Sequence, residues 1–211
     1  MDQVIQSKTS PHHLRNDCAR KRVNERRWWR VHSIFAGLLI ALSALSCVAQ
    51  STRASETEVE AAYLFNFGKF VDWPPAQPGE TFEICVLGKD PFGHVLDSTV
   101  AGENIASRQV TIARITNPRD ALACRVLFIS AQEKDHVKAI LSAVKGAGVL
   151  TVSDMPHFAE RGGMVEFVEQ EGRIRFEVNL APAIESKLTL SSELLKVAVK
   201  VLGKSGLEDG R

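Results

Sequence analysis

Residues 125–152 read RVLFISAQEKDHVKAILSAVKGAGVLTV and place a strand, a helix and a second strand in one short run. The unbroken apolar segment at 125–129 is typical of a strand that is buried on both faces. Ser130 opens a capping box, which predicts a helix over residues 134–144, and glycines end that helix just before the apolar strand at 149–152. This order of elements is typical of neighbouring parallel strands, so the run predicts an α/β domain.

The same pattern extends toward both ends of the chain. Apolar or alternating runs predict strands at 82–87 and 109–115, with a short helix between them at 92–96. Two later runs, 164–168 and 173–179, have the spacing of the two arms of a hairpin. We therefore expect a single three-layer α/β domain with a central, mostly parallel sheet, a C-terminal antiparallel hairpin and flanking helices.

Two further helices are predicted near the ends of this domain. Ser55 opens a capping box, and apolar residues then recur at helical spacing as far as Val71, which leaves Glu60 facing water. The apolar face of this first helix is rich in aromatic side chains. Such a face packs either on the protein's own core or on a partner, and the pattern favours the core. A last helix is predicted over residues 193–201.

The first 49 residues differ in composition from the rest of the chain. They hold eight of the 26 Lys/Arg residues and three of the 25 Asp/Glu residues, a balance of +5 that leaves −4 for residues 50–211. A basic run ending at Arg30 precedes an uncharged apolar segment at 33–46, which is shorter than the roughly 20 residues of a membrane span. Small residues follow, up to Ala49. These features are typical of a secretory signal peptide.

We therefore expect a signal peptide with a long basic n-region over residues 1–49 and an exported, periplasmic α/β domain over 50–211, with its core at about 55–202. An uncleaved anchor and lipid attachment at Cys47 are the alternatives. Loss of the leader would leave two cysteines, Cys85 and Cys124. In an oxidising compartment this pair favours a disulfide over two buried thiols.

Several functional classes find no support in the sequence. The net charge of +1, and the acidic balance after residue 49, argue against nucleic-acid binding. The sequence has no Gly-x-Ser-x-Gly elbow, no phosphate-binding loop and no zinc-type His or Cys motif. We therefore expect no catalytic residues, no metal and no cofactor.

Polar residues follow several predicted strands: they are Lys89, Asp90, Ser130, Ser153 and Asp154. Small molecules bind at the carboxyl ends of strands in open α/β sheets, so these residues could contact a ligand. Asp90, Ser130 and Ser153 or Asp154 are also well placed as helix caps, and the pattern favours capping.

The second arm of the hairpin carries a polar face. Alternation places four candidate ligand- or partner-binding residues on that face: Arg173, Arg175, Glu177 and Asn179. Two arginines on one strand face could hold an anionic ligand or the carboxylates of a partner. They could equally form a solvated face by pairing with Glu177 and Glu166, and the sequence leaves both interpretations open.

Seven blocks of sequence occur in a recognisable order. They lie at residues 60–74 (EAAYLFNFGKFVDWP), 84–93 (ICVLGKDPFG), 124–129, 149–154, 162–164, 175–180 and 190–195. Together they resemble the YfiR/HmsC-like family of periplasmic proteins, and the similarity runs from about Glu58 to Val201.

The resemblance implies a non-enzymatic periplasmic regulator. The best-known members of this family bind the periplasmic sensor region of a membrane diguanylate cyclase and repress it, which controls cyclic di-GMP, exopolysaccharide and biofilm. Members are often homodimers, and a cysteine pair matching Cys85 and Cys124 is common among them. Some carry a second cysteine pair later in the chain, which this sequence lacks.

A second hypothesis is a periplasmic small-molecule-binding sensor module, because the family also occurs beside other membrane receptors and sensor kinases. Its ligand would lie at the strand ends or on the face of Arg173 and Arg175.

Overall fold

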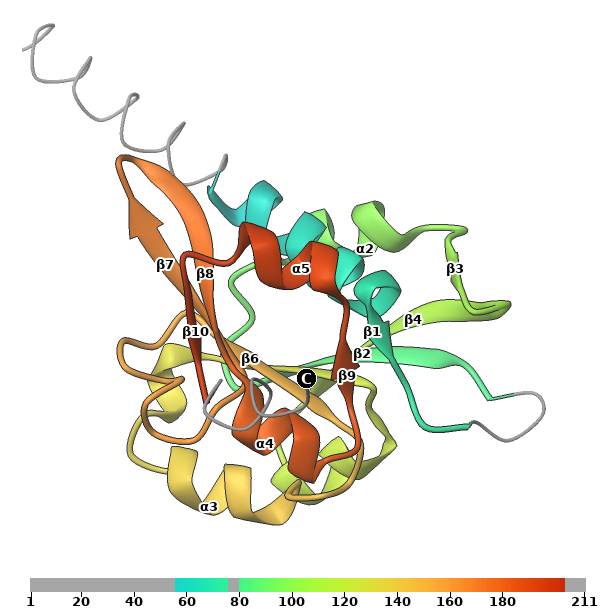
Figure 1. Ribbon diagram of the computed structural model, residues 1–211. Helices are drawn as coiled ribbons and strands as arrows, with labels where there is room; N and C mark the ends of the chain where they lie inside the picture. The colour runs from blue at the N-terminus through green and yellow to red at the C-terminus, as the bar shows by residue number, and fades with distance from the viewer. Residues whose placement is uncertain (1–55, 76–79, 204–211) are drawn as a thin grey trace, which may run out of the picture. The chain divides into compact units, whose positions relative to one another are not determined.

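The computed structural model describes residues 56–75 and 80–203 (Figure 1). The chain divides into two compact units, Met1–Thr52 and Arg53–Arg211, and every described residue belongs to the second. The expected signal peptide and Ser55 of the first capping box lie outside the described residues. Within the described ranges, no helix has the length and apolar character needed to cross a membrane.

The centre of the domain is an eight-stranded mixed sheet. Its strands are β2 (Phe82–Leu87), β3 (Asn104–Ile105), β4 (Arg108–Ile115), β5 (Val126–Ile129), β6 (Leu150–Ser153), β7 (Val165–Gln170), β8 (Arg173–Asn179) and β10 (Lys200–Leu202). They are arranged in the order β10-β8-β7-β6-β5-β2-β4-β3. The β7/β8 and β3/β4 pairs are antiparallel, and the other five pairs are parallel. The predicted mostly parallel sheet with a C-terminal hairpin is therefore confirmed.

A separate two-stranded sheet joins distant parts of the chain. Strand β1 (Val71–Asp72) pairs antiparallel with β9 (Thr189–Leu190), so that Val71 lies opposite Leu190. The pairing fixes the end of the N-terminal helix, which is described over residues 56–70, beside the segment that leads into the last helix. The sequence pattern did not predict these two short strands.

The helices differ from the predictions mainly at their ends. They are α2 (His94–Val100), α3 (Val137–Ala143), α4 (Leu180–Glu185) and α5 (Ser192–Val197), with 3-10 turns η1 (Pro118–Ala123) and η2 (Ala131–Glu133). The predicted last helix is shorter than expected, because the chain after Val197 leaves the helix to form β10 beside β8. Helix α4 was not predicted, although Asn179 caps it and Pro182 lies in its first turn.

Both faces of the sheet are buried, which gives the expected three layers (Figure 1). On one face, Val126 and Phe128 join the core formed with the N-terminal helix, α2, α4 and α5. On the other face, Leu127 and Ile129 join the core formed with α3 and η1. The continuous apolar run of β5 follows from this arrangement, because neighbouring residues point to opposite cores.

Candidate functional site

The polar residues at the carboxyl ends of the strands are engaged in local hydrogen bonds. Four of the five residues accept a backbone amide: Asp90 from Phe92 at 2.7 Å, Ser130 from Gln132 at 3.5 Å, Ser153 from Met155 at 3.0 Å and Asp154 from Ala131 at 3.1 Å. The fifth, Lys89, is exposed. Arg114 also binds Asp90, at 2.8 Å, and Asp97, at 2.7 Å. The predicted capping role is therefore confirmed. In many α/β sheets a ligand binds at this edge, whereas here these polar groups bind other residues of the protein itself.

Cys85 and Cys124 form the expected disulfide, with their Cα atoms 5.9 Å apart. Cys85 lies in β2, and Cys124 directly precedes the neighbouring strand β5 after the turn η1. Both are buried in the core on the α3 side of the sheet. The Glu83 carboxylate completes a metal-type cluster in which the ligand atoms lie within 4.8 Å of one another, but the two sulfur atoms are bonded to each other.

Arg173 and Arg175 are exposed on β8, and the guanidinium group of neither makes a hydrogen bond or ion pair with any residue in the described ranges. The two acids considered as their partners are engaged elsewhere. Glu166 accepts the amides of His157 at 2.8 Å and Ala159 at 3.0 Å. Glu177 lies 3.6 Å from the ammonium group of Lys200. Within the described residues the arginines therefore form no ion pair with Glu166 or Glu177, and both remain exposed to solvent.

The four candidate residues of β8 do not form one site. Arg173 and Arg175 line a shallow pocket beside the N-terminal helix. Asn179 caps α4: its amide donates to the Ala159 carbonyl at 2.8 Å, and its oxygen accepts the Ala181 amide at 3.2 Å. The strand therefore supplies its two arginines to one region of the domain and Asn179 to another.

A second, strongly apolar pocket adjoins the arginines. It has a volume of about 260 Å³ and is lined by Tyr63, Asn66, Phe67, Phe70, Phe176, Glu193, Leu194 and Val197. Two of these side chains remain notably exposed: Phe70 at 42% and Val197 at 52%. The N-terminal helix, predicted to face only the core, thus buries Leu64 and Phe67 but leaves Phe70 at the surface.

The two pockets form a continuous surface, because Tyr63 lines both. The Tyr63 ring lies 5.2 Å from the ring of Phe176 on β8 and 5.9 Å from that of Phe67. These ring contacts hold the helix on the hairpin in a fixed geometry. We call the lining of the two pockets the helix–hairpin surface; it brings exposed apolar side chains together with two exposed residues of β8, Arg173 and Arg175.

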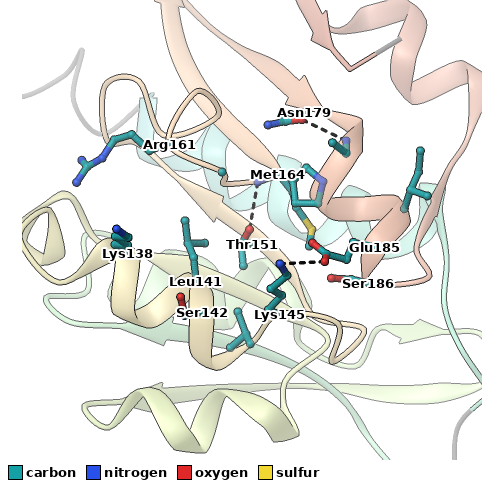
Figure 2. A pocket seen from close by; sticks show the side chains of 15 residues that line it. Lys138, Leu141, Ser142, Lys145, Thr151, Arg161, Met164, Asn179, Glu185 and Ser186 are labelled. Carbon is teal, nitrogen blue, oxygen red and sulfur yellow. Dashed lines mark hydrogen bonds and ion pairs between the residues drawn. The ribbon is translucent and has the colours of Figure 1, made fainter. Parts of the chain in front are cut away.

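A third cavity, of about 620 Å³, lies between α3 and α4 (Figure 2). Its residues are Lys138, Leu141, Ser142, Val144, Lys145, Thr151, Arg161, Gly162, Met164, Asn179, Ala181, Pro182, Ile184, Glu185 and Ser186. We call it the α3–α4 groove. It shares no lining residue with the helix–hairpin surface. Sequence patterns did not indicate it, because its walls come from segments that are far apart in the chain.

Glu60 is half-buried on the N-terminal helix, although the helical pattern predicted that it would face water. Its burial, together with the charges of Asp154 at the end of β6 and Glu56 on its own helix, raises the pKa of Glu60 to about 7. Burial also raises the pKa of Asp154. Two acids therefore approach each other where the helix crosses the end of β6.

Two solved structures that match the chain are distant from it in sequence. A conserved domain protein from Vibrio cholerae O1 biovar El Tor str. N16961 is 12% identical, with a TM-score of 0.43, and the match covers 56% of this chain and 54% of that chain. The ABC domain in complex with L-Trp from Streptococcus pneumonia is 11% identical, with a TM-score of 0.48 and coverages of 67% and 60%. The chain thus spans less than two thirds of either protein's length. No curated protein matches the chain.

The family comparison is more specific. The sequence model described as YfiR/HmsC-like matches residues 57–199. This range contains strands β1 to β9, the N-terminal helix from its second described residue, the α3–α4 groove and all of the helix–hairpin surface except Glu56. The chain therefore belongs to the YfiR/HmsC-like family, whose members are regulatory, non-catalytic periplasmic proteins.

Proposed function

We propose that this protein binds the periplasmic sensor region of a membrane-bound diguanylate cyclase and represses it, which lowers cyclic di-GMP and limits exopolysaccharide and biofilm. The family generally associates with membrane signalling proteins, which supports this role. The observation that carries the proposal is the helix–hairpin surface, since it joins exposed apolar groups to two arginines that have no partner in the described part of the chain.

The chemistry of this surface suggests what the partner segment must offer. An apolar side chain would fill the pocket beside Phe70 and Val197, where aromatic walls can remove it from water. Acidic residues nearby would pair with Arg173 and Arg175, whose planar groups suit bidentate contact with carboxylates. We therefore propose an apolar and acidic segment of the cyclase's periplasmic region as the occupant.

Deletion of the gene is expected to raise cellular cyclic di-GMP and to increase surface attachment, because the repressed cyclase would be released. Both quantities are measured in the deletion strain and after complementation with the full chain. An unchanged cyclic di-GMP level in the deletion strain would contradict the proposed function.

Complementation with charge-reversed protein tests the surface itself. The double variant Arg173→Glu/Arg175→Glu should bind its partner at least about tenfold more weakly and should fail to restore low cyclic di-GMP, since removal of interface charge pairs of this kind costs 2 kcal/mol or more. The control Lys89→Glu/Arg119→Glu changes the net charge equally at exposed positions away from the surface.

Two further variants, each with glutamate in place of an exposed apolar residue, test the apolar part of the surface. Val197→Glu should abolish repression, whereas Leu122→Glu, at a residue 57% exposed on η1, should not. Equal repression by the two variants would exclude the helix–hairpin surface as the binding face.

We also propose that residues 1–49 are removed as a signal peptide during export and that the mature protein forms a homodimer. Intact mass measurement of protein recovered from the periplasm should place the mature N-terminus at or near Gln50. A retained leader, or a lipid-modified Cys47, would contradict clean cleavage. Sedimentation of the same sample tests the dimer.

The second candidate function is a small-molecule-binding sensor module for another membrane receptor or sensor kinase. The α3–α4 groove favours it, because a cavity of about 620 Å³ is large enough for a small organic ligand.

A further inference from the structure

The α3–α4 groove has an apolar interior because its central polar groups are already engaged. The Thr151 hydroxyl on β6 accepts the Met164 amide at 3.1 Å, as Figure 2 shows. The Asn179 side chain is also engaged: its oxygen caps α4 by accepting the Ala181 amide, and its amide donates to the Ala159 carbonyl. What remains for a ligand inside is the apolar surface of residues such as Leu141, Met164 and Ile184.

The rim of the groove carries an excess of positive charge. Three cations, Lys138, Lys145 and Arg161, line it together with one acid, Glu185. Lys145 and Glu185 neutralise each other at 3.0 Å and connect α3 to α4. Lys138 and Arg161 form no ion pair with a carboxylate among the described residues.

These two unneutralised cations lie near each other. The Arg161 guanidinium donates to the Lys134 carbonyl at 2.6 Å and contacts the Met155 sulfur at 3.0 Å, which fixes its position. Lys134 follows η2 directly and lies only four residues before Lys138 on α3, so the carbonyl that holds Arg161 belongs to the turn that leads into this helix. In Figure 2 both cations lie on the left of the view, away from the Lys145–Glu185 pair on the right.

The apolar wall continues to the rim. Ile184 on α4 leaves 58% of its surface exposed, although it lies beside a groove that could cover it. Its side chain therefore offers apolar surface to a ligand in the groove, as the mostly apolar lining of small-molecule sites does. The groove therefore combines an uncovered apolar wall with an anion-attracting end.

We propose that the α3–α4 groove binds a small amphipathic organic anion, with its anionic group at Lys138 and Arg161 and its apolar body along Leu141, Met164 and Ile184. This proposal does not depend on repression of a cyclase. It rests on the second candidate function, a small-molecule-binding sensor module, and specifies the class of ligand for it. The same chemistry is offered by a free carboxylate with an aliphatic tail and by an anionic lipid.

Calorimetric titration of the purified protein with decanoate tests the proposal, with decanol as the uncharged analogue and inorganic phosphate as the anion without a tail. Decanoate should bind at one site per chain, and about tenfold more tightly than decanol or phosphate, since it alone uses both parts of the groove. Absence of decanoate binding at millimolar concentration, or equal binding of decanoate and decanol, would overturn the proposal.

Three variants locate the binding. Lys138→Gln should weaken decanoate binding about tenfold and leave decanol unchanged, since Lys138 has no structural contact to lose among the described residues. Ile184→Asn should weaken both ligands. Lys196→Gln on α5, outside the groove, serves as the matched control.

Sedimentation with phosphatidylglycerol vesicles distinguishes the two sources of the anion. Co-sedimentation that is lost in Lys138→Gln supports the site and assigns a lipid. Decanoate binding without co-sedimentation supports the site and assigns a free anion. If Lys138→Gln bound decanoate as tightly as the wild type does, the α3–α4 groove would not be the binding site.

Discussion

Replacement of both Cys85 and Cys124 by alanine is expected to lower the free energy of unfolding by about 4 kcal/mol. The disulfide joins residues 39 apart in the sequence, and its loss frees a long loop in the unfolded chain. Both cysteines are also buried, at 0% and 2% exposure, so their truncation leaves small voids in the α3-side core. A domain of this size is stable by only 5–15 kcal/mol, so the loss is large.

Urea denaturation and thermal unfolding measure this loss. A change of about 4 kcal/mol should lower the melting temperature by roughly 8–16 °C in a domain of this length. In excess reductant the wild-type protein should lose most of its greater stability relative to the double variant, because its disulfide is then reduced. Two reactive thiols in wild-type periplasmic protein, denatured without reductant, would contradict the bond itself.

The same variant separates stability from partner binding. Neither cysteine lines the helix–hairpin surface or the α3–α4 groove. At a temperature where the double variant is still folded, we therefore expect it to restore low cyclic di-GMP as the wild type does. Loss of repression by a folded double variant would show that the disulfide acts on function and not only on stability.

The strands that sequence predicts best are those whose burial is complete. The run at 125–129 and the run at 149–152 became β5 and β6 within one residue, because every position of such a strand faces one of two cores. Local sequence patterns are therefore enough to predict a strand whose residues are all apolar and all buried.

The elements that sequence could not predict depend on distant pairing. Strand β1 exists because Val71 meets Leu190, and α5 ends at Val197 because Lys200 aligns with Glu177 on β8. Residues 198–201 continue a helical apolar pattern in isolation, but the backbone hydrogen bonds of the sheet edge outweigh that preference.

The candidate sites show the same division. The alternation of residues along β8 correctly placed Arg173 and Arg175 on its polar side. It also grouped them with Asn179, which instead caps the start of α4. The α3–α4 groove joins Lys138 and Arg161 from separate segments, and neither residue stands in a recognisable motif. Only the folded positions of the helices reveal such a site.

Replacement of Glu60 by glutamine is expected to stabilise the protein at pH 8 by about 2–3 kcal/mol. The ionised carboxylate is disfavoured in the folded state, first by its burial and then by the nearby charges of Asp154 and Glu56. Glutamine keeps the size of the side chain and removes the charge. The figure allows for the partial exposure of Glu60, which screens part of the effect.

The sign of the pH dependence follows from the two pKa values. The pKa of Glu60 is about 7 in the folded protein and takes its ordinary value of 4.5 when the chain unfolds. The folded state therefore binds the proton more tightly, and the wild type should lose stability as the pH rises from about 4.5 to about 7. Above about pH 7 the full free-energy cost of ionising the buried Glu60 lowers the stability of the protein. Below pH 4.5 this cost is absent, because the carboxyl group is protonated in both states.

Urea denaturation of the wild type and Glu60→Gln between pH 4.5 and pH 8.5 should therefore give two curves that converge at the acid end and separate through neutrality. The matched control is Glu169→Gln, at an exposed position on β7, which should follow the wild type at every pH. A constant difference between wild type and Glu60→Gln would point to packing and not to charge. Curves that separate as predicted would show that ionisation of Glu60 lowers the stability of the domain as the pH rises, because the carboxylate is buried and its charge is repelled by Asp154 and Glu56.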